Sequence, residues 1–240
     1  MTSTSSRTRS SRTSRLRASR RRRAPSGSRT VWIVAAAVVV AAAVIALVAG
    51  GGGHKTTAGS GSTGAIAEFR PVTVTGSPLA ALPQSGPDPA RGLPAPELRG
   101  QTFDGQPVTV TADGEPKVVL MVAHWCPHCQ REVPLLAKYF QTNGLPKGAR
   151  LVTIATDTNA NSPNYPPSAW LARVGWPLPA MADDAGCTAA RAYGLSAFPF
   201  FCAIDAQNKV VLRVTGELST AQLEQVLNAA RTGTVPPGSP

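Results

Sequence analysis

Two cysteines separated by two residues constrain this sequence more than any other feature. Cys126 and Cys129 follow a continuous apolar run, residues 118–122, and open a segment whose apolar residues have helical spacing. Two thiols at the start of a helix form and break a disulfide with little movement of the backbone. The pair therefore predicts a redox site at the point where a buried strand passes into a helix.

The helix start distinguishes the two sulfurs. Unpaired backbone N–H groups and the positive end of the helix macrodipole lie at a helix N-terminus and favour a negative sulfur. We therefore expect Cys126 to ionise and attack disulfides, and Cys129, one turn deeper, to resolve the mixed disulfide. Pro127 suits the first turn, where its missing N–H costs nothing. A protonated His128 beside the sulfurs would stabilise the thiolate further and make the pair a stronger oxidant.

A structural zinc site is the main alternative for this cysteine pair. Such a site needs a second Cys-x-x-Cys or a spaced pair of histidines elsewhere, and the sequence contains neither. His124 and His128 bracket Cys126 and, with Cys129, place two nitrogens and two sulfurs within a short stretch. Delivery of copper or zinc is therefore kept as an alternative function. A redox pair that needs no metal and no other cofactor is the primary expectation.

The stretch 125–129, Trp-Cys-Pro-His-Cys, resembles the active site of thioredoxin-fold proteins. Extended through Glu132 and Pro134, it is similar to the Cys-x-x-Cys-x-x-Glu-x-Pro signature of membrane-anchored thiol-disulfide oxidoreductases of the TlpA/ResA type. Its Pro-His dipeptide is instead typical of periplasmic disulfide oxidases. The resemblance covers residues 94–231 and implies a thioredoxin-like α/β fold, a three-layer sandwich around a central mixed β-sheet. Of the two directions we favour an oxidant; a reductant serving cytochrome c maturation is the alternative.

The resemblance also implies roles for single residues. Trp125 would pack beside the sulfurs, and Glu132 would influence proton release from the second cysteine, a surface salt bridge being the plainer interpretation. The family's proline that matches Pro199 is cis and faces the cysteine pair, so Phe198 and Pro199 would border an extended substrate. Leu120 stands where thioredoxins carry a buried acid, so the general base must be Glu132, a histidine or water.

Cys187 and Cys202 complete an even set of four cysteines, which fits an oxidising compartment. One interpretation is a structural disulfide between a helix start and a strand. The other is a pair of small buried hydrophobic residues. We favour the disulfide.

The net charge of +11 is concentrated at the N-terminus. Residues 1–30 contain ten Arg and no acid, which leaves 14 Lys and Arg against 13 Asp and Glu in the rest of the chain. A nucleic-acid-binding protein would carry such charge on its folded part, so we expect no nucleic-acid partner. Residues 31–49 are uncharged and nearly reach the roughly 20 residues that cross a bilayer. They predict one transmembrane helix with a cytoplasmic N-terminus, a cleaved signal peptide being the alternative.

These segments predict a cell-membrane protein whose catalytic domain lies outside the cytoplasm. We expect a disordered basic arm at 1–30, a flexible Gly/Ser linker at 50–66, an extended Pro-rich segment packing on the domain at 67–94, the thioredoxin-like domain at 95–232 and a disordered tail at 233–240. The expected partners are thiols and disulfides of exported proteins, together with a membrane redox partner that recycles the pair.

Apolar patterns predict the elements of the domain. Strands are expected at 101–103, 107–111, 117–123, 150–156, 178–181, 199–205 and 209–215, with a weak edge strand within 68–75. Helices are expected at 127–142, 167–174 and 187–193, and after Ser219 as N-cap. Strands and helices that alternate and then end in a hairpin and a helix follow the thioredoxin order with a central insertion.

Overall fold

A mixed β-sheet organises the part of the chain that the computed structural model describes, residues 65–235 and 237. Its strands are β1 (Thr73–Thr75), β2 (Glu97–Thr102), β3 (Pro107–Val110), β4 (Lys117–Val122), β5 (Arg150–Ala155), β6 (Ala180–Ala182), β7 (Phe200–Ile204) and β8 (Val210–Thr215). They run in the order β1-β2-β6-β5-β4-β7-β8, and β3 also pairs with β2. The central strand β4 is parallel to β5 and antiparallel to β7, so the sheet is mixed, as predicted.

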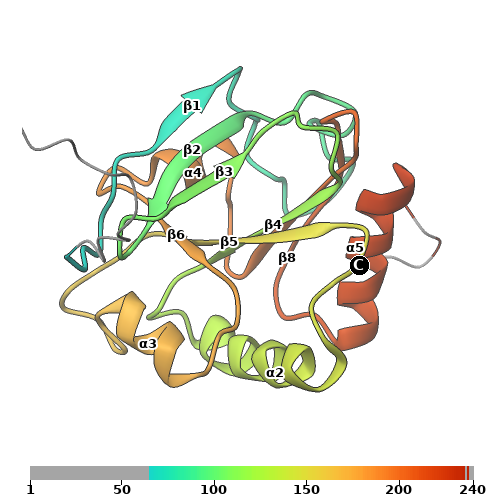
Figure 1. Cartoon of the computed structure of the whole chain (residues 1–240). Helices are drawn as coiled ribbons and strands as arrows, with labels where there is room; N and C mark the ends of the chain where they lie inside the picture. The colour runs from blue at the N-terminus through green and yellow to red at the C-terminus, as the bar shows by residue number, and fades with distance from the viewer. Residues whose placement is uncertain (1–64, 236, 238–240) are drawn as a thin grey trace, which may run out of the picture. The chain divides into compact units, whose positions relative to one another are not determined.

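Helices cover both faces of this sheet. They are α2 (Pro127–Asn143), α3 (Pro167–Arg173), α4 (Thr188–Ala192) and α5 (Thr220–Thr232). Apolar residues of α2, α3 and α5 form one core with Val118, Leu120 and Val122 of β4, whereas α4 packs in a second core with Val119 and Met121. Figure 1 shows α2 along the bottom of the view, α5 at the right and α4 behind the strands at the upper left. Because β4 supplies both cores, all its residues are buried, as expected of a strand covered on both faces.

Local sequence explains where the two longest helices begin. Ser219 caps α5: its side chain accepts a hydrogen bond from the Gln222 N–H at 3.3 Å, and the Gln222 side chain accepts one from the Ser219 N–H at 2.9 Å. The N-cap of α2 is Cys126, followed by Pro127 at the first helical position. Gly144 ends α2 with a φ of +82°, which favours glycine. Both helix starts agree with the sequence prediction.

A buried ion pair holds the Pro-rich segment against the sheet. Arg213 on β8 has a fully buried side chain and donates hydrogen bonds to both carboxylate oxygens of Asp88, at 2.5 and 2.9 Å. It also donates to the carbonyl oxygens of Ala80 and Tyr193, at 2.9 and 2.8 Å. Although burial opposes it, hydrogen bonding by Arg213 and Ala90 lowers the pKa of Asp88 below its ordinary value. The ion pair therefore fixes the Pro-rich segment before β2 to β8, which is the edge strand at the opposite end of the sheet from β1.

Some strands start or end at residues other than those predicted. β2 begins at Glu97 instead of residue 101, because Leu98 pairs with Val74 of β1 on one side and with Val110 of β3 on the other. The predicted strand at 178–181 is β6, shifted toward its partners on β5 and β2. In such short strands the neighbouring strands, more than the local residue pattern, decide where pairing starts.

The predicted cytoplasmic arm, the transmembrane helix and nearly all of the linker fall in residues 1–64, outside the described residues. Within residues 65–235 and 237, no helix has the length and apolar character needed to cross a membrane. At the other end, Gly233 caps α5 and Val235 packs against the core. Residues 236 and 238–240 of the predicted tail lie outside the described residues.

We expect Asp88→Asn to lower the free energy of unfolding by about 3–5 kcal/mol, because it leaves the buried guanidinium of Arg213 without a counter-charge. Urea titration of the purified protein measures this loss. Glu115→Gln is the matched control, since Glu115 also pairs with an arginine, at 2.8 Å from Arg150, but 51% of its side chain is exposed. The control should lose about 1 kcal/mol or less. Equal losses in the two variants would contradict the role given to the buried pair.

Candidate active site

The two cysteines of the predicted redox pair lie where α2 follows β4. Cys126 is the N-cap residue, with an extended backbone at φ −70° and ψ 122°, and Cys129 lies in the first turn. Cys126 keeps 5% of its surface exposed, whereas Cys129 keeps none. No helical carbonyl precedes the N–H groups of this first turn, so they favour negative charge on the Cys126 sulfur. Of the two sulfurs, only that of Cys126 belongs to a residue with any exposed surface, so an incoming sulfur would meet Cys126 first.

Cys129 is suited to the resolving role. The structure holds both thiols of the pair in the reduced form. Burial, together with the nearby Cys126 and Glu132, raises the pKa of the Cys129 thiol well above its ordinary value. The main cause is that a charged sulfur would lose its hydration there. Cys129 therefore remains protonated near neutral pH until a reaction at Cys126 gives it a partner.

Glu132 is buried on the next turn of α2, with 2% of its surface exposed. Its Oε1 accepts a hydrogen bond from the Leu218 N–H at 2.6 Å, and Oε2 has no hydrogen-bond partner among the described residues. Burial raises the pKa of Glu132 to about 7; the Leu218 hydrogen bond opposes this shift and the charge of Glu217 adds to it. A carboxyl group that titrates near neutral pH can accept or release a proton next to the pair. Its burial excludes the surface salt bridge.

The loop before β7 faces the attacking sulfur. The Phe198–Pro199 peptide bond is cis, as predicted, and Pro199 is buried. The Cys126 sulfur lies 3.9 Å from the carbonyl oxygen of Phe198. This distance places the backbone of the loop beside the reacting atom, where an extended substrate would hydrogen-bond.

Two aromatic side chains lie next to the pair. The rings of Trp125 and Phe198 pack edge to face, with centroids 5.8 Å apart and an angle of 84°. The Trp125 indole N–H also donates to the carbonyl oxygen of Asp157 at 2.7 Å. Both rings are half-buried, so they present an apolar surface beside Cys126. Trp125 and Phe198 thus occupy the positions expected of residues that border the site.

His124 is engaged on both of its ring nitrogens. Its Nδ1 lies 2.7 Å from the carbonyl oxygen of Pro163, and its Nε2 lies 3.1 Å from the Asn159 N–H. Because the carbonyl accepts and the N–H donates, His124 is held as the tautomer protonated on Nδ1. Neither nitrogen is left for a metal ion. In the described part of the chain, no group of three or more His, Cys, Asp or Glu side chains is arranged to hold a metal.

His128 has partners that the sequence analysis did not identify. Its Nδ1 lies 2.6 Å from Glu217 Oε1 and 2.8 Å from Arg131 Nη2, and 58% of its side chain is exposed. Within the described residues, the hydrogen-bonding partners of its ring are these two side chains and not either sulfur. His128 was expected to stabilise the thiolate from beside the sulfurs; in the structure its ring instead hydrogen-bonds to charged side chains, with which such bonds are strong. Glu217 was missed because it lies 89 residues further along the chain.

Cys187 and Cys202 are free thiols in this structure, so the favoured structural disulfide is not present in it. Cys202 is fully buried in β7, and burial raises the pKa of its thiol to about 12. Cys187 is the half-buried N-cap of α4, in a left-handed backbone conformation with φ +53°. Cys202 fills the sheet's second core as a small hydrophobic residue, which was the alternative interpretation.

The family model described as Redoxin matches residues 90–229. No curated protein matches the sequence significantly. Among solved structures, a thiol:disulfide interchange protein of the thioredoxin family from Chlorobium tepidum TLS is 28% identical, with 59% of this chain and 98% of that chain covered and a TM-score of 0.48. StoA from Bacillus subtilis is 16% identical, with 56% and 98% covered and a TM-score of 0.47.

A hypothetical protein from Sinorhizobium meliloti 1021 is 20% identical to this chain. The match covers 62% of this chain and 88% of that one, with a TM-score of 0.52. This likeness is one of fold. Together with the family match, the mixed sheet and its helices are consistent with a thioredoxin-like α/β fold.

The raised pKa of Glu132 should make stability depend on pH. The carboxyl group titrates near 4.5 in its ordinary state and at about 7 in the fold. Between these values the folded state binds more protons than the unfolded state, so stability falls as the pH rises. At about 1.4 kcal/mol per pH unit, this group removes about 3 kcal/mol between pH 4.5 and pH 7.

Glu132→Gln removes this titration. We therefore expect the free energy of unfolding of the reduced protein to fall less between pH 5 and pH 8 in the variant than in the wild type, with Glu224→Gln as the exposed control. Urea titrations at both pH values measure the difference. Parallel curves for the wild type and Glu132→Gln would show that Glu132 has no raised pKa.

Proposed function

Since this chain belongs to the Redoxin family and is a thiol-disulfide oxidoreductase, we propose that it oxidises thiols of exported proteins outside the cytoplasm, using Cys126 and Cys129. The observation that carries this proposal is the difference between the two sulfurs. Cys126 lies at a helix N-terminus and keeps a small exposed surface, whereas Cys129 has none and its pKa is raised by burial. A dithiol built this way has one sulfur for the substrate and one for closing the disulfide.

The proposed reaction begins with the Cys126–Cys129 disulfide. A substrate thiolate attacks the Cys126 sulfur, the bond between the two cysteines breaks, and Cys129 leaves with the electron pair and takes up a proton. Glu132, whose pKa is raised to about 7, is the nearby group suited to supply that proton. A second substrate thiolate then attacks the substrate sulfur of the mixed disulfide and releases Cys126 as a thiolate. Two electrons pass from the substrate to the protein.

Stabilisation of the reduced form supports the oxidising direction. The helix N-terminus and the nearby Arg131 guanidinium both favour a thiolate at Cys126. A stabilised thiolate makes the disulfide a stronger oxidant, and the Pro127-His128 dipeptide points the same way. The competing proposal, a reductant serving cytochrome c maturation, is supported by the resemblance of Glu132 and Pro134 to the TlpA/ResA signature.

The proposed location depends on the N-terminal sequence. Residues 31–49 are uncharged and follow an arm of ten arginines, which supports a membrane anchor with the domain on the outer side. A membrane redox partner would then return the dithiol to the disulfide after each reaction. The copper or zinc carrier is less well supported, because backbone groups engage both ring nitrogens of His124.

Substitution of each cysteine tests the roles. We expect Cys126→Ser to abolish disulfide exchange with a reduced, unfolded protein substrate, because the attackable sulfur is lost. Cys129→Ser should accumulate mixed disulfides with the substrate, because the resolving sulfur is lost; non-reducing gels followed by mass spectrometry detect them. Cys187→Ser is the control and should retain exchange. Activity in Cys126→Ser equal to that of the wild type would refute the assignment.

Equilibration with glutathione decides the direction. For an oxidant we expect a reduction potential between about −180 and −120 mV, and for a reductant one below about −220 mV. The fraction of reduced protein at defined ratios of reduced to oxidised glutathione, measured by thiol alkylation, gives the potential. A value in the lower range would replace the oxidant with the reductant in this proposal.

A further inference from the structure

Three consecutive residues between β8 and α5 contact three different parts of the site. The Gly216 N–H donates to the carbonyl oxygen of Pro199 at 2.9 Å. The Glu217 carboxylate binds His128 and Arg131. The Leu218 N–H donates to the buried carboxylate of Glu132 at 2.6 Å. Residues 216–218 thus connect three parts of the site: the loop before β7 that contains Pro199, the start of α2, and the buried carboxyl group of Glu132.

Glu217 is the charged member of this segment. Its Oε1 lies 2.6 Å from His128 Nδ1 and 3.0 Å from Arg131 Nε, and it also accepts a hydrogen bond from Arg131 Nη2. Hydrogen bonds from Arg131 and then from His128 lower the pKa of Glu217, so the carboxylate is ionised at neutral pH. One carboxylate oxygen therefore binds two side chains from the first turns of α2, those of His128 and Arg131.

The position of His128 Nδ1 shows how closely these three groups are coupled. This nitrogen lies within hydrogen-bond distance of both the Glu217 carboxylate and Arg131 Nη2, at 2.6 and 2.8 Å. With a proton it donates to Glu217, and without one it accepts from Arg131, but it cannot do both. The Glu217 carboxylate therefore offsets the positive charge of Arg131 and competes with Arg131 for His128 Nδ1.

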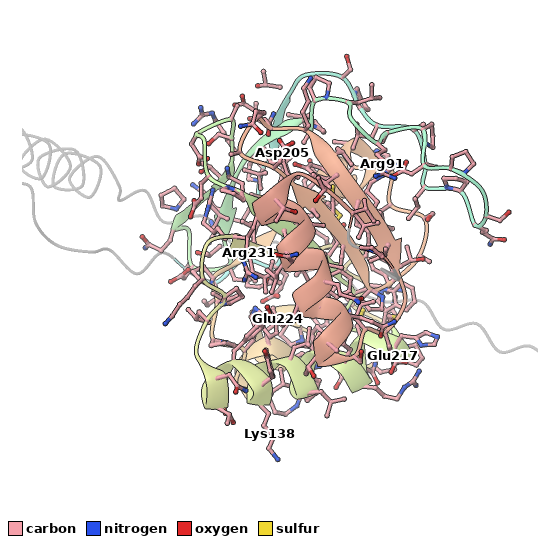
Figure 2. The ribbon with its side chains drawn as sticks, turned by 90° about the vertical axis from the view of Figure 1, so that its right-hand side faces the viewer. Arg91, Lys138, Asp205, Glu217, Glu224 and Arg231 are labelled. Carbon is pink, nitrogen blue, oxygen red and sulfur yellow. The ribbon has the colours of Figure 1, made fainter. Side chains whose placement is uncertain are left out.

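The surroundings of these two side chains include the attacking sulfur. Cys126 is the N-cap of α2, and His128 and Arg131 lie in the first turns of the same helix, so their charges belong to the same helix start as the attacking sulfur. The charge of Cys126 also contributes to the raised pKa of Arg131, after the hydrogen bond to Glu217 and the charge of Glu217. A cation near Cys126 stabilises its thiolate and with it the reduced form of the pair. Neutralising that cation has the opposite effect. Figure 2 shows Glu217 beside the end of α5 nearest α2, whereas Glu224 and Arg231 lie farther along α5.

We infer that Glu217 is a positioning residue which, by holding His128 and Arg131, partly neutralises them and lowers the reduction potential of the Cys126–Cys129 pair. Glu217 touches neither sulfur and acts only through these two side chains. The inference rests on the proposed disulfide exchange by this pair. It assigns to the segment between β8 and α5 the control of how strongly oxidising the pair is.

The test measures the equilibrium of the purified full-length protein with glutathione at pH 7 in low salt. Glu217→Gln keeps the size and hydrogen-bonding capacity of the side chain but removes its charge. We expect the equilibrium to shift about fivefold toward the reduced protein, which corresponds to a potential about 20 mV higher for a two-electron couple. Arg131→Gln should shift it in the opposite direction, because a cation is lost.

Two further measurements separate this role from a merely structural one. In 1 M NaCl the difference between Glu217→Gln and the wild type should shrink, because salt screens exposed charges. In a His128→Gln, Arg131→Gln background, adding Glu217→Gln should change the equilibrium by less than about twofold, because the side chains through which Glu217 acts are absent. The matched control is Glu224→Gln: Glu224 pairs with Arg231 at 3.4 Å on α5, and its loss should leave the potential unchanged.

The possible results are distinct. Equal equilibria for the wild type and Glu217→Gln would overturn the inference, as would a shift that persists undiminished in the double background. Failure of the wild type to equilibrate with glutathione, or full exchange activity in Cys126→Ser, would instead overturn the proposed function. A shift confined to Glu217→Gln, reduced by salt and absent in the double background, supports the inference.

Discussion

The structure depends on one junction, where a fully buried strand passes directly into a helix. Because β4 is covered on both faces, its end lies at the edge of the core, and α2 must begin there. This places Cys126 at the helix start with a little exposed surface and Cys129 inside the core with none. The chemical difference between the two sulfurs therefore follows from their depth, because burial penalises a charged sulfur and a helix N-terminus favours one.

The same junction explains the buried acid. Glu132 lies on the face of α2 that packs against the core, on the side of Cys129, so its carboxyl group loses hydration. Among residues 65–235 and 237 it gains one hydrogen bond, from the Leu218 N–H. A buried, underpaired carboxyl group costs stability when it ionises, and natural proteins usually keep such a group where chemistry uses it. Leu120 on β4 leaves no acid on the strand, so in this chain the titrating carboxyl group beside the pair comes from the helix.

Residues that are distant from α2 in the sequence also contact the active site. The segment between β8 and α5 binds Glu132 through its backbone and His128 through Glu217, and its Gly216 N–H fixes the carbonyl of Pro199. On the opposite side, Arg213 of β8 binds Asp88 of the Pro-rich segment. β8 and residues 216–218 therefore link the active site to the Pro-rich segment before β2. Neither β8 nor residues 216–218 contain a cysteine of the redox pair.

The sequence by itself determined the redox pair, the start of α2 and the order of the main strands and helices. These features rest on local signals: residue spacing, capping residues and the depth implied by an apolar run. The cis bond before Pro199 was expected from the resemblance to the thioredoxin fold, and the structure contains it. Only the tertiary structure decided the partners of His128, the burial of Glu132 and the place of Cys202 in the second core. Each of these depends on side chains brought together from distant segments, and neither the spacing nor the composition of one segment records which distant charge will lie beside it.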